Sequence, residues 1–215
     1  MQVNDTSLTH DGLDAAPFDT PSRGRICVIA CGALAREILD ILALNTLDHV
    51  TLTCLPAILH NTPEKITDAV ADKIHWARSK GYSEIHIAYA DCGTGGQLAA
   101  LCAIEQVTLM EGAHCYAFFQ GVEIAAQHDD TTSFYLTDFL ARQFDAFVWR
   151  PLGLETHPEL LQMYFGNYKK LVYLEQVHHP DTFKKAQEAA ERMGLEFEHR
   201  PTGYGDLSTF ITNVD

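Results

Sequence analysis

The chain has 215 residues, of which 47% are hydrophobic and 20% are charged, a composition typical of a folded protein and not of a disordered one. Asp and Glu outnumber Lys and Arg by 29 to 15, which gives a formal net charge of −14. Because nucleic acids and anionic membranes attract basic surfaces, this charge argues against both as partners. We expect the partner to be a small molecule or another protein.

Residues 1–22 are polar and acidic, and they are predicted to form a flexible tail or a loosely docked arm. They lack the basic start and apolar stretch of a signal peptide, and no apolar run in the chain reaches the roughly 18 residues of a membrane span. We therefore expect a cytoplasmic protein. In a reducing compartment its six cysteines should pack, bind metal or react, and should not form structural disulfides.

After the tail, short apolar runs alternate with segments of helical periodicity. The predicted strands are 25–31, 50–55, 84–89, 107–110, 170–175 and 195–199. The predicted helices are 33–44, 63–80, 97–105, 116–127, 137–144, 158–165 and 181–193. This alternation predicts an α/β fold with a doubly wound, mostly parallel, Rossmann-like sheet and helices on both faces. No linker requires a second domain, so residues 23–215 are predicted to form a single domain.

Sulfur or imidazole side chains follow each of the first four predicted strands. They are Cys31, His60, Cys92, and the pair His114 and Cys115. Ligands of open parallel sheets bind beyond the carboxyl ends of the strands, so these side chains should meet at one edge. Zinc and iron prefer thiolate and imidazole, and three protein ligands leave one position open for water or substrate. The sequence therefore predicts a metal site, with zinc preferred and iron or an iron–sulfur cluster as the alternative.

The pair His114 and Cys115 needs a choice, because adjacent residues of an extended segment face opposite sides. We favour Cys115 as the ligand, with His114 as its alternative or as a donor to a ligand. His60 is predicted either as a fourth ligand or as a loop histidine that caps a backbone carbonyl. The remaining cysteines lie inside predicted strands or a helix, where cysteine packs as a small hydrophobe. They are Cys27, Cys54 and Cys102.

Two carboxylates lie near the predicted site. Glu37 is in the first helix and Asp91 immediately precedes Cys92. Either carboxylate could orient a ligand or act as a general base. The alternatives are a solvated helix position for Glu37 and a turn residue for Asp91.

The sequence DCGTGG at residues 91–96 follows a predicted strand and opens a helix. The backbone amides of Gly93, Gly95 and Gly96 could therefore hold an anionic cofactor. The same letters resemble the first motif of Rossmann-type S-adenosylmethionine methyltransferases, although that motif normally follows the first strand of its domain. An S-adenosylmethionine-dependent methyltransferase is thus a second hypothesis. Cys92 could also be a nucleophile at the start of the helix.

Several motifs in this order resemble the family known as domain of unknown function 1638, over about residues 25–205. These motifs are IACGALAREI, LPAILHNTPE, YADCGTGG, GAHCY, LTDFLARQFD, YFGNYKKLVYLEQ and PTGYG. Their positions include the six residues Cys31, Glu37, His60, Cys92, His114 and Cys115.

Members of this family resemble accessory proteins of corrinoid-dependent methyltransferases that act on methylamines and betaines. The resemblance therefore implies an enzyme or accessory factor in corrinoid-linked one-carbon metabolism. A third hypothesis is a non-catalytic partner of a methyltransferase or its reductase. The sequence lacks the corrinoid-binding pattern D-x-H-x-x-G, so we do not expect the chain to bind the cobalt cofactor itself.

Overall fold

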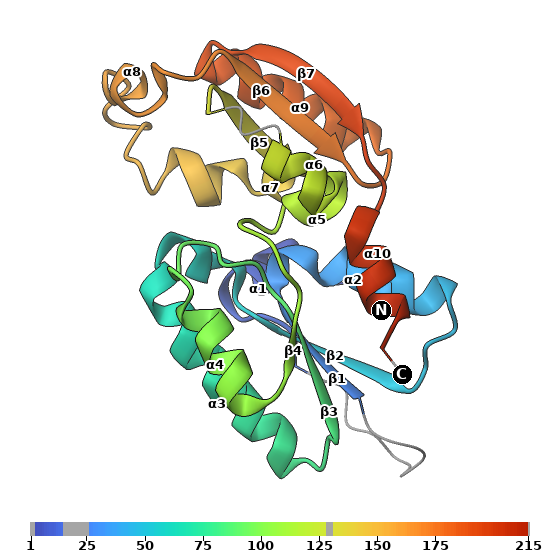
Figure 1. Cartoon of the computed structure of the whole chain (residues 1–215). Coiled ribbons are helices and arrows are strands. Elements are labelled where there is room, and N and C mark those ends of the chain that lie inside the picture. The colour runs from blue at the N-terminus through green and yellow to red at the C-terminus, as the bar shows by residue number, and fades with distance from the viewer. Residues whose placement is uncertain (1–2, 15–25, 128–130, 215) are drawn as a thin grey trace. The chain divides into compact units, whose positions relative to one another are not determined.

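A computed structural model describes residues 3–14, 26–127 and 131–214 (Figure 1). The chain divides into two compact units. One contains the described residues up to Phe118 and those from Asp206 onward, and the other is Phe119–Gly205. Each unit contains a parallel sheet with helices packed on it, which confirms the predicted α/β class. That residues 23–215 behave as a single domain stays a prediction.

The first unit has a four-stranded sheet in the order β2-β1-β3-β4, and all neighbouring strands are parallel. The strands are β1 (Ile26–Cys31), β2 (Val50–Leu55), β3 (Glu84–Ala88) and β4 (Thr108–Leu109). Every residue of β1 is buried, as expected for a central strand that is covered on both faces. From β1 the chain moves to β2 at one edge of the sheet, and from β3 it moves to β4 at the other edge. The direction of winding therefore reverses between the neighbouring strands β1 and β3.

The connecting helices make this sheet doubly wound. They are α2 (Ala35–Leu44), α3 (Ile66–Ser79) and α4 (Gln97–Glu105). Right-handed crossovers that run in opposite directions along a sheet place their helices on opposite faces. Accordingly, α3 and α4 cover one face of this sheet and α2 covers the other (Figure 1). Short 3₁₀ turns at Gly32–Leu34, Ala57–Asn61 and Pro63–Lys65 lead from the strand ends into α2 and α3.

Part of the predicted N-terminal tail is docked on the first unit. Residues Asp5–His10 form α1, whose Leu8 is 1% exposed. Leu13 exchanges two backbone hydrogen bonds with Cys54 of β2, at 2.9 and 2.8 Å. Residues 15–22 of the predicted tail lie outside the described residues. At the other end of the chain, helix α10 (Gly205–Thr212) buries Leu207 and Ile211; the sequence analysis did not predict this helix.

The second unit has a three-stranded parallel sheet in the order β5-β6-β7. Its strands are β5 (Ser133–Thr137), β6 (Lys170–Glu175) and β7 (Glu196–Pro201). Its helices are α6 (Val122–Gln127), α7 (Asp138–Arg142), α8 (Leu160–Phe165) and α9 (Pro180–Met193), with a π-helical turn at Asp145–Trp149. The short helix α5 (Ala117–Gln120) contains the boundary between the two units. The single helix predicted over 116–127 is two helices here, separated at Gly121, whose φ is +96°. None of the described helices is long and apolar enough to cross a membrane.

Candidate thiolate site

The candidate site lies at the carboxyl ends of β1 and β3, where the strand order of the first unit reverses. Cys31 is the last residue of β1. Because Ala30 of β1 is in register with Ala88 of β3, the next residue, Tyr89, comes beside Cys31. In open α/β sheets this reversal point is where the loops diverge and ligands bind.

The loop after β3 holds Cys92 in a backbone conformation that only glycine adopts easily. The φ angle of Cys92 is +47°, and that of the following Gly93 is +89°. A side chain in this left-handed region costs about 1 kcal/mol or more, and such residues concentrate at functional sites. The fold therefore maintains an unfavourable backbone at one of the predicted metal ligands.

The carboxylate of Asp91 fixes this loop. It accepts hydrogen bonds from the Thr94 hydroxyl at 2.8 Å, from the Gly96 amide at 2.7 Å and from the Gly95 amide at 3.2 Å. The Gly96 and Thr94 bonds are the main reason that the pKa of Asp91 lies below its ordinary value. Asp91 therefore acts as a turn residue here, and two of the amides predicted to hold an anionic cofactor are already bonded to its carboxylate.

A second loop brings Cys115 to Cys92. The amide of Asp91 donates to the carbonyl of Gly112 and the amide of Cys92 donates to that of Ala113, both at 2.9 Å. The Sγ atoms of Cys92 and Cys115 are consequently 3.3 Å apart. This distance is longer than the ~2.05 Å of a disulfide and shorter than the ~3.8 Å expected between two thiolates bound to one zinc ion.

The pKa values of Cys92 and Cys115 shift in opposite directions. The hydrogen bond from Cys115, opposed by burial and supported by a hydrogen bond from His60, lowers the pKa of Cys92 to about 5. The same Cys92 contact and burial raise the pKa of Cys115 above its ordinary value. Burial raises the pKa of Cys31 to about 12, and the charge on Cys92 adds to this rise. The directions of these shifts favour the anionic form at Cys92 over Cys31 and Cys115.

Tyr89 completes the cluster, and the sequence analysis did not identify it. The residue is 2% exposed, and burial, followed by electrostatic interactions with the neighbouring Cys31 and Cys115, raises the pKa of its hydroxyl. The hydroxyl lies by the Cys31 thiol, but among the described residues it has no hydrogen-bond partner of ordinary geometry. The one signal in the sequence is its position at the carboxyl end of the predicted strand 84–89.

The other predicted site residues lie in different surroundings. His60 is exposed at the end of a 3₁₀ turn and hydrogen-bonds to Cys92, so its imidazole faces the cluster. His114 is exposed and stacks on Tyr116 with ring centroids 5.3 Å apart. Glu37 is 4% exposed in α2 and therefore not a solvated helix position. Within the described part of the chain, no three His, Cys, Asp or Glu side chains are arranged to hold a metal ion as they stand.

The second unit contains two buried carboxylates at the carboxyl edge of its own sheet, which the sequence analysis also missed. Glu175, at the end of β6, bonds to His178 at 2.9 Å and to His199 of β7 at 3.1 Å. Asp138, after β5, accepts the Tyr173 hydroxyl at 2.7 Å and the Val177 amide at 2.9 Å. Each carboxylate oxygen in these bonds has a hydrogen-bond partner within the unit, so both carboxylates connect the ends of neighbouring strands.

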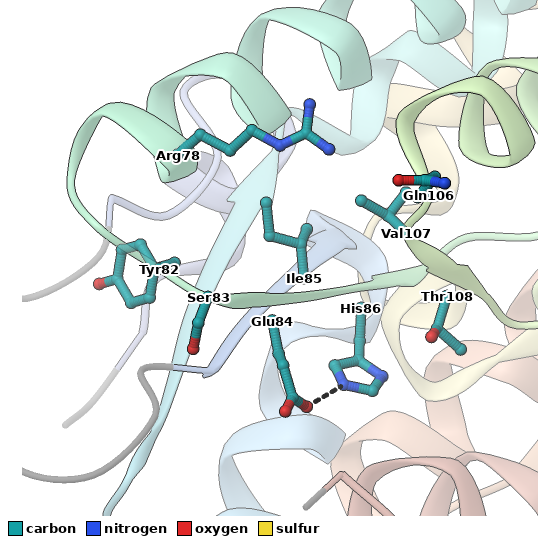
Figure 2. A pocket seen from close by; sticks show the side chains of 9 residues that line it. All are labelled: Arg78, Tyr82, Ser83, Glu84, Ile85, His86, Gln106, Val107 and Thr108. Atoms are coloured by element: carbon teal, nitrogen blue, oxygen red, sulfur yellow. Dashed lines mark ion pairs between the residues drawn. The ribbon is translucent and has the colours of Figure 1, made fainter.

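A hollow of about 250 Å³ lies in the first unit at the start of β3 and β4 (Figure 2). Its lining is mostly polar, and Figure 2 shows Glu84 and His86, 3.6 Å apart, projecting from β3. Arg78 of α3 also borders it, and its guanidinium pairs with Glu105. The hollow is at the amino ends of the strands, so it is separate from the cysteine cluster at their carboxyl ends.

Residues 54–211 match the family described as protein of unknown function (DUF1638). The matched region extends from β2 to α10 and includes His60, Cys92 and Cys115, whereas Cys31 precedes it. No curated protein and no solved structure matches the chain.

Proposed function

The chain belongs to the DUF1638 family of proteins of unknown function, and we propose that it is a metalloprotein that binds one zinc ion through Cys31, Cys92 and Cys115. The observation that carries this proposal is the 3.3 Å approach of two sulfurs from separate loops. Two thiols that meet at a ligand-binding edge, beside a third thiol and an imidazole, form the donor set that zinc prefers.

Metal binding requires a small rearrangement of the cluster. The two sulfurs would separate by roughly 0.5 Å to reach the spacing set by ~2.3 Å zinc–sulfur bonds. The Cys31 thiol, which already interacts electrostatically with Cys92 and Cys115, would turn toward them. Zinc replaces the thiol protons and thereby removes the repulsion between three adjacent thiolates.

His60 contributes an imidazole beside the three thiols, through its hydrogen bond to Cys92. Its hydrogen bond to Cys92 orients that sulfur, and in this arrangement the fourth coordination position is left for an exogenous ligand. A zinc ion with such an open position activates a bound water or thiol. If His60 rotated onto the metal instead, the site would be closed and structural.

We place this site in corrinoid-linked one-carbon metabolism, as an enzyme or an accessory factor. Support for this role comes from the resemblance of the ordered motifs, and from the suitability of zinc thiolate sites for activating thiol acceptors of methyl groups. The strongly acidic composition is compatible with a partner protein of opposite charge.

The test is a zinc titration of protein purified under reducing conditions, in competition with a chromogenic chelator. We expect about one zinc per chain for the wild type and at least a tenfold lower affinity for Cys92→Ser and Cys115→Ser. Cys102→Ala is the matched control, because burial alone perturbs the pKa of Cys102 and no cluster thiol acts on it. Fewer than about 0.2 equivalents in the wild type, or unchanged affinity in Cys92→Ser, would contradict the proposal.

A second candidate function is thiol–disulfide exchange. Its specific support is the strained backbone of Cys92 together with the lowered pKa of its thiol. In this reaction the Cys92 thiolate attacks a disulfide substrate and releases one thiolate. Cys115 then displaces the second thiolate, so the protein disulfide forms as the substrate gains two electrons.

Alkylation by iodoacetamide separates the two candidates. In metal-free protein, the alkylation rate of Cys92 should rise through a midpoint near pH 5 under either candidate. Under the zinc proposal, one equivalent of zinc protects Cys92 and Cys115 from alkylation but leaves Cys102 unaffected. If added zinc gives no protection and a glutathione disulfide substrate is turned over, exchange is the function.

A further inference from the structure

We propose that Cys92 and Cys115 form a reversible intramolecular disulfide when the reduced protein reacts with a hydroperoxide. This reaction needs no bound metal, and its oxidant is a peroxide and not the disulfide substrate of an exchange reaction. It assigns to the cysteine cluster a chemical modification and the class of molecule that brings it about.

The distance between the two thiols is the main support. Their Sγ atoms are 3.3 Å apart, so the sulfurs need to approach by only about 1.3 Å to reach the ~2.05 Å of a disulfide bond. Two backbone hydrogen bonds of 2.9 Å, from Asp91 to Gly112 and from Cys92 to Ala113, hold the two loops together. The loops are therefore already side by side, and the remaining movement is that of the two side chains.

Exposure favours a small oxidant that reaches the pair where Cys115 is open to solvent. The side chain of Cys115 is partly exposed, whereas Cys92 is only 6% exposed. A hydroperoxide is a small two-electron oxidant of thiolates, so it suits both the restricted access and a pair of sulfurs that is oxidised together. The other four cysteines are buried, namely Cys27, Cys31, Cys54 and Cys102.

The reaction has two steps. One sulfur of the pair, as a thiolate, attacks an oxygen of the hydroperoxide; the S–O bond forms as the O–O bond breaks, and the departing oxygen takes up a proton to give water or an alcohol. The second sulfur loses its proton and attacks the first; the S–S bond forms, the S–O bond breaks, and hydroxide leaves with that proton as water. The two thiols thus lose two electrons and two protons, and the hydroperoxide gains them.

The close approach of the second sulfur also determines the product. A sulfenic acid without a neighbouring thiol is open to irreversible further oxidation, whereas a thiol in contact with it gives a disulfide that a reductant reopens. The thiolate is the form of cysteine that binds metal, so the disulfide and the proposed zinc ion exclude each other. This last consequence rests on the proposed function, but formation of the disulfide does not.

The test uses reduced, metal-free, full-length protein treated with a small excess of hydrogen peroxide, with free thiols counted by alkylation and linked peptides identified by mass spectrometry. The wild type should lose two of its six free thiols, gain a linkage between Cys92 and Cys115, and recover all six thiols with dithiothreitol. The pair should react at least about tenfold faster than Cys102. Cys102→Ala is the matched control and should form the same linkage. Cys115→Ser should instead show a dimedone adduct of a sulfenic acid on Cys92.

Three results would overturn the inference: six free thiols after the peroxide treatment, a linkage that excludes Cys115, or a sulfinic acid on Cys92 with Cys115 still free. A zinc titration of the oxidised wild type should give at least about tenfold lower affinity than the reduced protein, and dithiothreitol should restore it. Reduced protein that forms the linkage but binds no zinc would remove the proposed function alone. Reduced protein that binds zinc but forms no linkage would remove this inference alone.

Discussion

Replacing Asp91 with alanine should release the loop that holds Cys92. The Asp91 carboxylate accepts hydrogen bonds from one hydroxyl and two backbone amides, and the substitution removes all three. Because the loop is close to solvent and water can replace part of each bond, we take less than 1 kcal/mol per bond and expect a loss of about 2 kcal/mol in the free energy of unfolding. For a chain of this size, such a loss lowers the melting temperature by about 4–8 °C.

The lowered pKa of Asp91 determines how the stability difference between Asp91→Ala and the wild type changes with pH. Hydrogen bonds to the ionised carboxylate lower the pKa of Asp91 from 3.8 in the folded protein. The carboxylate therefore stabilises the fold fully above its unfolded pKa, and this stabilisation is lost as the pH falls through the folded pKa. The difference in stability between the wild type and Asp91→Ala should be constant near neutral pH and should shrink as the pH falls below about 4.

The assay is urea unfolding followed by circular dichroism at several pH values, with zinc affinity measured in parallel. Asp14→Ala is the control, because the side chain of Asp14 is 98% exposed and its ion pair with Lys73 at 3.3 Å is of the weak surface kind. Zinc affinity should fall in Asp91→Ala but not in Asp14→Ala, since Cys92 would leave its left-handed conformation. Equal stability of Asp91→Ala and the wild type at pH 7, or a difference that does not shrink at all as the pH is lowered below about 4, would refute the reasoning.

Two further predictions concern the fold and the cofactor. In Gly32→Ala, the new methyl group would lie 2.4 Å from the carbonyl oxygen of Leu8. We therefore expect the free energy of unfolding, measured with urea, to fall by about 1–3 kcal/mol. Unchanged stability would show that α1 does not pack against the end of β1. Calorimetry with S-adenosylmethionine should show no binding, because the amides of Gly95 and Gly96 are bonded to Asp91; saturable heat at micromolar cofactor would instead support the methyltransferase hypothesis.

The predicted elements of the first unit follow from strong local patterns. Buried runs rich in β-branched residues at 26–31 and 50–55 identify strands. The rule that ligands of a parallel sheet bind at the carboxyl ends of its strands predicts that Cys92 and Cys115 lie close together, and their sulfur atoms are in contact. The strand Ser133–Thr137 was missed because its five residues lead directly into α7. No linker composition marks the boundary between the two compact units after Phe118, so the sequence offers no signal for it.

The groups that sequence reasoning did not find depend on register or on distant contacts. Tyr89 reads as an ordinary core aromatic until the pairing of β1 with β3 places it beside Cys31. Glu175 meets His199 only because β6 and β7 are neighbours, across 24 residues of sequence. The Asp91 carboxylate accepts its hydrogen bonds from its own loop because Cys92 and the glycines that follow have positive φ angles. The composition of the loop does not specify these angles.

X-ray absorption at the zinc edge of the zinc-loaded chain tests the central claim most directly, because it counts the atoms bound to the metal. We predict three sulfur neighbours at about 2.3 Å and one lighter or exogenous ligand in the wild type, with one sulfur fewer in Cys115→Ser. A zinc ion surrounded only by oxygen and nitrogen, or an unchanged sulfur count in Cys115→Ser, would contradict the assignment of the metal to these cysteines.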